Sequence, residues 1–344
     1  MPSGRKKRAE YNLIIKMLTL PLILLSLLAT TLAAPATIEK DDTPLPVLIW
    51  HGLGDNYAAD GINDVAGLIQ DINPGTFVYP IRLAEDPSGD RSATFLGNTT
   101  EQIEGVCADL AKHPILSTAP AVDAIGFSQG GLFLRAYVER CNYPPVRSLV
   151  TFGSPHNGIA AYAGCKSTDW LCKGAMALLH YNTWSHFVQS RLVPAQYYRD
   201  IDPETGLPSE QYLENSNLLA DVNNERELKN TTYAANIASM TNFVLYDFAN
   251  DTTVVPKQSE WFAEVNATTE EVTPLQERKL YTEDWLGLKA LDKKGGLIFK
   301  TAPGEHMSIT DKLLNSTVKD YFGPYNRFSR RKSALQQTLG GLEL

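Results

Sequence analysis

Short apolar runs alternate with helical hydrophobic stripes over the first 150 residues. Val47–Trp50 is a compact apolar run that leads into a glycine-containing loop, which predicts a buried strand. Apolar residues at 62, 65, 66 and 69 then follow the i, i+3, i+4, i+7 spacing of an amphipathic helix. Further strands are predicted at 77–79, 122–125 and 148–152, and helices at 103–110 and 131–140. This alternation indicates an α/β fold with a mostly parallel sheet and helices on both faces.

The alternation is interrupted between about residues 160 and 235. No strand-like run occurs there, and a helical, aromatic-rich segment contains Met176, Leu179, Trp184 and Phe187. Strand patterns return at 243–248 and 297–300. We therefore expect one domain over residues 37–325 with a helical insertion at about 160–235. A polar, basic tail at 326–344 would follow it, with a dibasic processing site there as an open alternative.

The composition is that of a globular protein: 43% of the 344 residues are hydrophobic and 20% are charged. The net charge is −8, although the first 36 residues are basic, so the remainder is more acidic still. A chain this acidic lacks the basic face that binding to a phosphate backbone requires. We expect no nucleic-acid partner.

The N-terminus has the features of a secretory leader. Basic residues at 5–8 precede an apolar run at 17–34, and Ala34-Pro35-Ala36 fits a signal-peptidase site. We expect a signal peptide over residues 1–36, and a mature chain that does not span the membrane. An uncleaved signal anchor is the alternative, although the run is at the short end for a span and contains Pro21.

The cysteines and glycosylation motifs agree with a secretory route. Four cysteines allow three disulfide connectivities, and proximity favours Cys165–Cys172, which leaves Cys107–Cys141. A zinc site is the alternative, but no C-x-x-C or H-x-x-x-H spacing supports it. Five Asn-x-Ser/Thr motifs predict N-glycosylation at Asn98, Asn230, Asn250, Asn266 and Asn315.

A candidate nucleophile lies between the predicted strand at 122–125 and the helix that follows it. Gly126-Phe127-Ser128-Gln129-Gly130 matches the G-x-S-x-G pattern of a nucleophile elbow, in the required strand–turn–helix context. The glycines are needed because the serine occupies a strained turn in which Cβ atoms would meet the neighbouring strand and helix. The N-terminus of the helix also offers N–H groups to an oxyanion. The pattern predicts an α/β-hydrolase fold with Ser128 as nucleophile.

A nucleophilic serine needs a base, and the base needs an acid to orient it. In α/β-hydrolases the chain order is Ser, acid, His, and among the six histidines His306 is the one after both late strands. His156 is a rival base, but it precedes any plausible acid. Asp251, in a loop just after the strand at 243–248, is the preferred acid over Asp247. We expect Asp123 to be a capping or strand-edge charge.

The oxyanion hole is predicted from two backbone N–H groups, those of Leu53 and Gln129. Leu53 lies in the loop after the first strand, where the second donor of an α/β-hydrolase is found. A dinucleotide-binding fingerprint is the alternative for this loop, but Tyr57 occupies the position of the third glycine. No metal or nucleotide motif is present, so we expect no cofactor.

The longer motifs resemble the palmitoyl-protein thioesterase family. The resemblance extends over about residues 45–325 and includes 48–55, 126–131, 219–223, 259–262, 274–277, 280–282, 286–289 and 304–306. It implies that Ser128, Asp251 and His306 form the triad and that Leu53 and Gln129 form the oxyanion hole. The same two disulfides and glycans on Asn230 and Asn250 are also implied. An adjacent cysteine pair of the animal enzymes is absent, since Asn56-Tyr57 stands there.

The resemblance implies a serine hydrolase that cleaves the thioester of S-palmitoylated cysteine in proteins or peptides during their degradation. Its partners would be S-acylated proteins and fatty acyl chains, in the lysosome or vacuole or after secretion. The helical insertion is a candidate wall of the acyl groove, and core packing would explain its apolar residues equally well. A secreted lipase or ester hydrolase with the same triad is one alternative. A non-catalytic lipid carrier is the other.

Overall fold

The computed structural model describes residues 43–161, 168–266 and 268–326. Six parallel strands form the central sheet, and two short strands form a separate antiparallel pair. The strands of the central sheet are β1 (Val47–Trp50), β2 (Val78–Pro80), β3 (Val122–Phe127), β4 (Val146–Phe152), β5 (Asn242–Phe248) and β8 (Leu297–Ala302). The antiparallel pair consists of β6 (Glu264–Val265) and β7 (Val272–Thr273).

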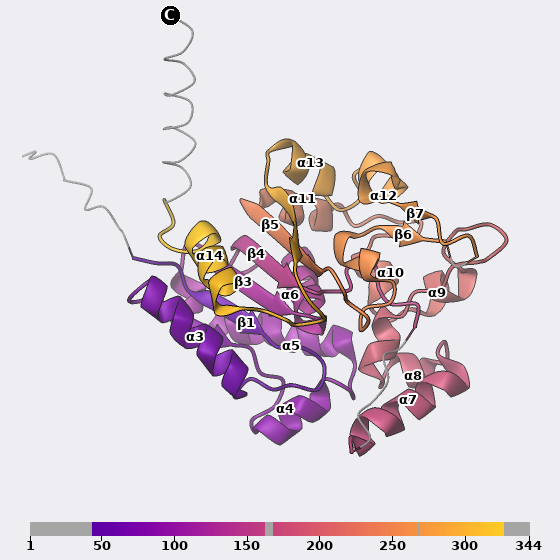
Figure 1. Cartoon of the computed structure of the whole chain (residues 1–344), viewed down its shortest axis with the longest axis horizontal. Coiled ribbons are helices and arrows are strands. Elements are labelled where there is room, and N and C mark those ends of the chain that lie inside the picture. The colour runs from indigo at the N-terminus through magenta and orange to yellow at the C-terminus, as the bar shows by residue number, and fades with distance from the viewer. Residues whose placement is uncertain (1–42, 162–167, 267, 327–344) are drawn as a thin grey trace, which may run out of the picture. The chain divides into compact units, whose positions relative to one another are not determined.

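Helices connect these strands (Figure 1). In the first half of the chain they are α3 (Asp60–Ile72), α4 (Pro87–Ala93), α5 (Thr99–Lys112) and α6 (Gln129–Arg140). Between β4 and β5 they are α7 (Trp170–Asn182), α8 (His186–Gln189), α9 (Glu210–Asn215), α10 (Leu219–Val222) and α11 (Thr231–Ser239). After β5 come α12 (Lys279–Thr282), α13 (Leu288–Lys293) and α14 (Asp311–Tyr321). The 3₁₀ helices are η1 (Leu116–Thr118), η2 (Val193–Tyr197), η3 (Lys257–Trp261) and η4 (Leu275–Glu277).

The strand order is β2-β1-β3-β4-β5-β8, and every neighbouring pair is parallel. The chain runs from β1 to β2 on one side and then returns to place β3 on the other side of β1. Such a reversal separates the loops that leave the two strands and opens a crevice at their carboxyl ends. The loop at 51–55 and the β3–α6 turn both lie at this crevice.

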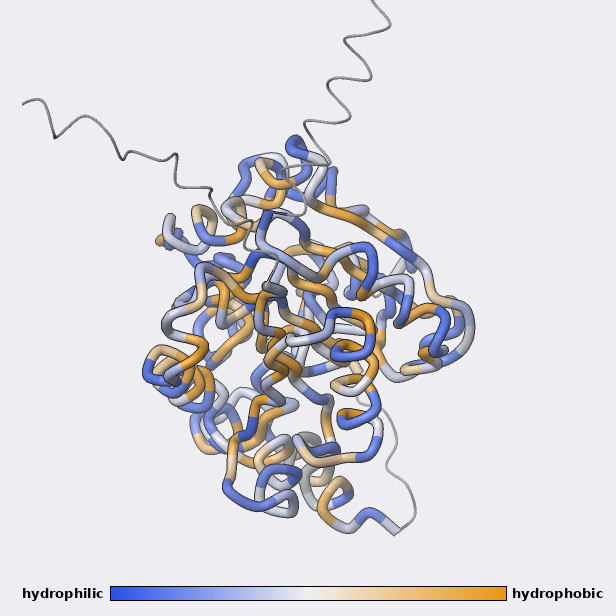
Figure 2. The backbone as a smooth tube through the Cα atoms, turned by 90° about the vertical axis from the view of Figure 1, so that its left-hand side faces the viewer, coloured by the Kyte–Doolittle hydropathy of each residue, from blue (hydrophilic) through white to orange (hydrophobic). Residues whose placement is uncertain are grey.

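Alternate residues of each strand enter two separate hydrophobic layers. One layer joins Val47, Ile125 and Val150 to the apolar faces of α3 and α14. The other joins Leu48, Ala124 and Leu149 to α5, α6, α11 and α13. Figure 1 shows α14 (yellow) beside α3 (indigo), and the two helices are in contact. In Figure 2 many hydrophobic stretches lie toward the middle of the fold, and many of the outer turns are hydrophilic.

The α/β-hydrolase prediction is correct in its parallel sheet and its two helical layers. The predicted strands and helices all form, with boundaries that differ by a few residues. Several short elements give no clear periodic signal in the sequence, among them α4, α13 and the β6–β7 pair. In the described part of the chain between β4 and β5, helices and isolated bridges occur without a strand. None of the helices in the described ranges is long and apolar enough to cross a membrane.

Some predictions fall on residues outside the described ranges. They include the signal peptide at 1–36, the tail from residue 327 onward, and Cys165 of the Cys165–Cys172 pair. Cys107 and Cys141, in contrast, form a disulfide with a Cα–Cα distance of 6.1 Å. This disulfide connects α5 to the end of α6.

A buried ion pair ties β3 and β4 to the end of the domain. The Arg147 guanidinium donates two hydrogen bonds to Asp123, of 2.9 and 2.5 Å, and others to the carbonyl oxygens of Gly323 and Pro324. Both side chains of the pair are almost fully buried. The expectation that Asp123 is a capping or strand-edge charge was therefore wrong. Its carboxylate is a core group that holds the C-terminal segment against the sheet.

Removing one partner of this pair should destabilise the fold strongly. We expect Arg147→Met to lower the free energy of unfolding by about 3–5 kcal/mol, because Asp123 is left buried without its counter-charge. The double variant Asp123→Leu with Arg147→Met should recover most of that loss, since no buried charge remains. Urea denaturation of the three proteins measures the effect. A loss below about 1 kcal/mol in the single variant would contradict it.

Candidate active site

Ser128 occupies a strained turn between β3 and α6. Its φ of 51° lies in the left-handed region that side chains other than glycine rarely adopt. The surrounding glycines make the turn possible. A Cβ on Gly130 would clash with the backbone carbonyl oxygens of Trp50 and His51, and one on Gly126 with the backbone of Gly131. Glycine is therefore required on both sides of Ser128, and the turn lifts its side chain to the edge of the sheet.

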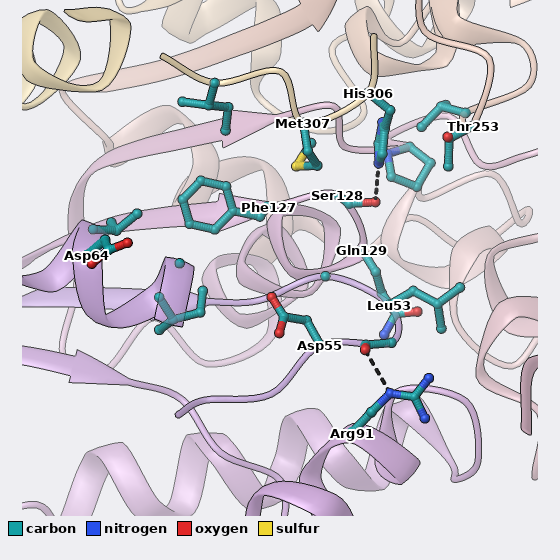
Figure 3. A pocket seen from close by; sticks show the side chains of 18 of the residues that line it. Leu53, Asp55, Asp64, Arg91, Phe127, Ser128, Gln129, Thr253, His306 and Met307 are labelled. Atoms are coloured by element: carbon teal, nitrogen blue, oxygen red, sulfur yellow. Dashed lines mark hydrogen bonds between the residues drawn. The ribbon is translucent and has the colours of Figure 1, made fainter. Parts of the chain in front are cut away.

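Ser128, His306 and Asp251 form a continuous hydrogen-bonded chain. His306 Nε2 lies 3.0 Å from Ser128 Oγ, the contact that Figure 3 marks with a dashed line. His306 Nδ1 lies 2.5 Å from Asp251 Oδ2. The three side chains come from the turn after β3, the loop after β5 and the loop after β8. Because these parallel strands end at the same edge of the sheet, their loops meet there. The structure thus brings together the three residues that the sequence analysis selected.

Asp251 is held as a carboxylate aimed at His306. Its Oδ1 accepts hydrogen bonds from the backbone N–H groups of Thr253 and Val254, at 2.7 and 3.0 Å. The side chain is buried, which by itself raises the pKa of the carboxyl group. Hydrogen bonds and the charge interaction with His306 outweigh burial, and the net pKa of Asp251 is below its usual value. The group remains ionised well into the acid range.

The rival residues are occupied elsewhere. His156 is fully buried, its Nε2 lies 3.0 Å from Thr151 Oγ1, and its ring stacks on Phe262 at a centroid distance of 4.9 Å. Burial lowers the pKa of His156 well below its usual value, and the charge of Arg135 lowers it further. Its ring is thus a neutral core group. Asp247 lies within β5 and, unlike Asp251, has no hydrogen bond to His306.

Leu53 and Gln129, the predicted oxyanion residues, both line the cleft beside Ser128 (Figure 3). Gln129 is the first residue of α6, so its backbone N–H lies at the positive end of the helix dipole. Its side chain is fixed, because Gln129 Oε1 accepts a hydrogen bond from the Tyr197 hydroxyl. The β1 loop lies against the elbow, since a Cβ on Gly52 would be 3.2 Å from Ser128 Cβ.

Arg91 of α4 and Thr94, the residue that follows α4, hold the β1 loop in place. Gly54 N donates to Thr94 Oγ1 at 2.9 Å. Arg91 Nε donates to the Gly54 carbonyl at 3.0 Å, the contact that ends at Arg91 in Figure 3. Asp90 is fully buried and accepts the backbone N–H of Tyr57 at 2.8 Å. The sequence analysis did not identify this support. The segment from Asp86 to Thr94 is too short and polar to give a periodic signal.

A cleft of about 1470 Å³ opens at Ser128. Charged side chains, among them Asp64 and Asp71, contribute to its lining together with many apolar ones, among them Phe95, Ile159, Leu171, Phe127, Met307, Ile309 and Leu314. Arg91 crosses its edge and donates a 2.6 Å hydrogen bond to Asp169, which caps the N-terminus of α7. A long apolar chain can be buried here next to the nucleophile.

Two of the residues proposed for the groove wall lie elsewhere. Trp184 packs against Tyr198 and Tyr212, and Phe187 is 54% exposed beside Arg191. Among the described residues of the insertion, those that line the cleft include Trp170 and Leu171 at the start of α7. Helical periodicity alone does not distinguish the end of a helix that reaches the cleft from its interior.

The predicted glycosylation sites differ in their surroundings. Asn230 and Asn250 are exposed, whereas Asn98, Asn266 and Asn315 are partly buried. The Asn98 side chain also accepts a 2.8 Å hydrogen bond from Asn217. Within the described residues, no group of three or more His, Cys, Asp or Glu side chains is arranged to hold a metal ion.

The elbow predicts a sharp contrast between two glycine substitutions. Gly130→Ala should lower the free energy of unfolding by about 3 kcal/mol or more, because its Cβ meets fixed backbone oxygens. Gly105→Ala, in the exposed middle of α5, meets no atom within 4 Å and should stabilise the protein by about 0.5–1 kcal/mol. Thermal and urea unfolding measure both. Equal effects of the two substitutions would disprove the close packing at the elbow.

Comparison with known proteins identifies the family. The family described as palmitoyl protein thioesterase matches residues 46–306. Palmitoyl-protein thioesterase 1 of Caenorhabditis elegans is 36% identical over 87% of this chain and 98% of its own length. A palmitoyl-protein thioesterase-dolichyl pyrophosphate phosphatase fusion of Schizosaccharomyces pombe is also 36% identical, over 81% of this chain and 43% of its own.

A more distant relative and a solved structure were also found. The lysosomal thioesterase PPT2 of Homo sapiens is 28% identical over 82% of this chain and 86% of its own. Among solved structures, esterase PE8 is 14% identical with a TM-score of 0.39, covering 80% of this chain and 90% of its own. The match over residues 46–306 includes the elbow, the loop after β5 and His306. The chain belongs to the palmitoyl protein thioesterase family.

Proposed function

We propose that this protein is a serine hydrolase that cleaves the thioester of long-chain fatty-acylated cysteine in proteins or peptides. The observation that carries the proposal is the chain from Ser128 Oγ through His306 to Asp251, at the edge of a cleft with many apolar side chains in its lining. The names of the family and of its relatives supply the acyl group and the thioester. The cleft agrees with them, because each buried CH₂ of an acyl chain contributes about 0.8 kcal/mol.

In the first half-reaction Ser128 Oγ attacks the thioester carbonyl carbon. His306 Nε2, 3.0 Å from that oxygen, takes its proton. Asp251 holds the ring by the 2.5 Å contact at Nδ1 and stabilises the imidazolium that forms. The carbonyl oxygen becomes an oxyanion, for which the backbone N–H groups of Leu53 and Gln129 are the proposed donors.

Collapse of the tetrahedral intermediate expels the cysteine thiolate, which takes the proton back from His306. A thiol has a pKa of about 8.5, so it leaves more readily than an alkoxide. In the second half-reaction water attacks the acyl-Ser128 ester while His306 again serves as base. The fatty acid departs and Ser128 is regenerated.

An acidic compartment is the proposed place of action. Asp251 has a lowered pKa and stays ionised at acid pH, so the orienting charge of the triad persists there. Relatives named lysosomal thioesterases support a lysosome or vacuole as the destination. The expected signal peptide would provide entry to the secretory route.

The nucleophile can be tested with a palmitoyl-cysteine peptide. Release of free thiol by the wild type should fall at least about 10³-fold in Ser128→Ala, because no acyl-enzyme can form. Turnover that survives in the variant would disprove the triad. If the wild type instead cleaves only oxygen esters such as a triacylglycerol, it is a lipase. Stoichiometric acyl binding without turnover would identify a carrier.

The cleft predicts a dependence on acyl length. With otherwise identical acyl-cysteine peptides from C8 to C16, kcat/KM should rise by up to about fourfold per added CH₂ until the apolar lining is filled. Leu171→Asp should lower kcat/KM more for the C16 substrate than for the C8 substrate, because it places a charge in the lining. The rise with acyl length should therefore be flatter in this variant. A series with no length dependence would exclude this cleft as the acyl site.

A further inference from the structure

A second carboxyl group is buried behind the acid of the triad. Glu260 lies in η3, which packs directly on β5, and its side chain is 1% exposed. Neither of its carboxyl oxygens has a hydrogen-bond partner in good geometry, and the backbone of Phe248 stabilises its charge only weakly against burial. A buried carboxylate without a donor would cost several kcal/mol. Its burial at this position therefore requires an explanation.

The groups that face Glu260 are negatively charged. The nearest is Asp251, with which the Glu260 carboxyl shares a hydrogen bond, and Asp247 on β5 is the next. Lys257, on the same 3₁₀ helix, donates to the Ala249 carbonyl and is exposed to solvent at that bond. No cation among the described residues forms a salt bridge with Glu260.

Two ionised carboxylates cannot share a hydrogen bond, so one of the two must carry a proton. Burial raises the pKa of Glu260 to about 10, and the charge of Asp251 adds to the effect. The pKa of Asp251 is lowered, because His306 and two backbone N–H groups stabilise its charge. Glu260 is thus the neutral acid, and its O–H is the donor that the contact requires.

We propose that Glu260 is a positioning residue of the hydrolase: its carboxylic acid O–H donates a hydrogen bond to Asp251 and holds that carboxylate ionised and directed at His306. The inference rests on the proposed function, since it assigns Glu260 a role through the triad. Asp251 then receives hydrogen bonds from His306, from the backbone of its own loop and from η3. No atom of Glu260 takes part in bond making, and its proton stays in place through the cycle.

The variants Glu260→Gln and Glu260→Leu separate this role from a packing role. The amide of Gln keeps a neutral donor of nearly the same shape, whereas Leu keeps the volume and removes the donor. We expect Glu260→Gln to stay within about threefold of the wild type in kcat/KM. Glu260→Leu should lose about tenfold, as expected for a hydrogen bond to a charged group.

The pH profile gives a readout that packing alone would not move. Without the donor, the ionised form of Asp251 is less stable, so the acid limb of kcat/KM should shift to higher pH in Glu260→Leu and stay in place in Glu260→Gln. The melting temperature of Glu260→Leu should equal or exceed that of the wild type, because a buried acid is replaced by an apolar group. Asp247→Asn is the matched control. Its kcat/KM should stay within about twofold of the wild type, and the acid limb of its pH profile should not shift.

The rate of Ser128 labelling by a fluorophosphonate, measured across pH, makes the test independent of the acyl substrate. If the wild type is labelled but does not hydrolyse the thioester, the proposed substrate is wrong. The role of Glu260 can then still be tested by comparing the labelling rates of the variants. A Glu260→Leu protein that labels at the wild-type rate with an unshifted profile would overturn the inference. An equal loss of labelling rate in Glu260→Gln and Glu260→Leu would overturn it too, because a neutral hydrogen-bond donor at this position would then not preserve the activity.

Discussion

The close approach of β1, β3 and α6 is the constraint on which the rest of the site depends. Gly126, Gly130 and Gly131 leave no room for a Cβ, because the backbone of α6, the backbone at the end of β1 and the side chain of Thr151 on β4 already occupy that space. This packing imposes the left-handed backbone on Ser128. The same contact brings the β1 loop against the serine, so nucleophile and oxyanion loop are positioned by one steric condition.

The sequence was sufficient to predict the role of a residue where local backbone chemistry sets that role. The G-x-S-x-G turn follows from the glycines themselves, and the alternation of apolar runs and helical stripes follows from two fixed periodicities. Asp251 and His306 could be selected because the carboxyl ends of parallel strands share one edge of the sheet. The positions of these elements in the chain then limited the choice to a few loops.

The sequence was insufficient to predict the role of a residue where that role depends on its partner in a tertiary contact. Asp123 follows the pattern of a strand-edge charge, yet it is a core group because Arg147 reaches it from the next strand. Trp184 and Leu171 both belong to the aromatic-rich insertion, and only the fold decides which one faces the cleft. Glu260 stands beside Trp261 and Phe262 in the chain, and nothing local indicates that its neighbour is another acid.

The triad joins residues that are far apart in the order of synthesis. Ser128 and His306 are separated by 178 positions, and His306 follows β8, the edge strand that pairs only with β5. A growing chain that has already formed β1, β3 and α6 therefore carries a shaped serine turn without a base. The nucleophile gains its base only when β8 has docked beside β5 and placed His306 at the edge of the sheet.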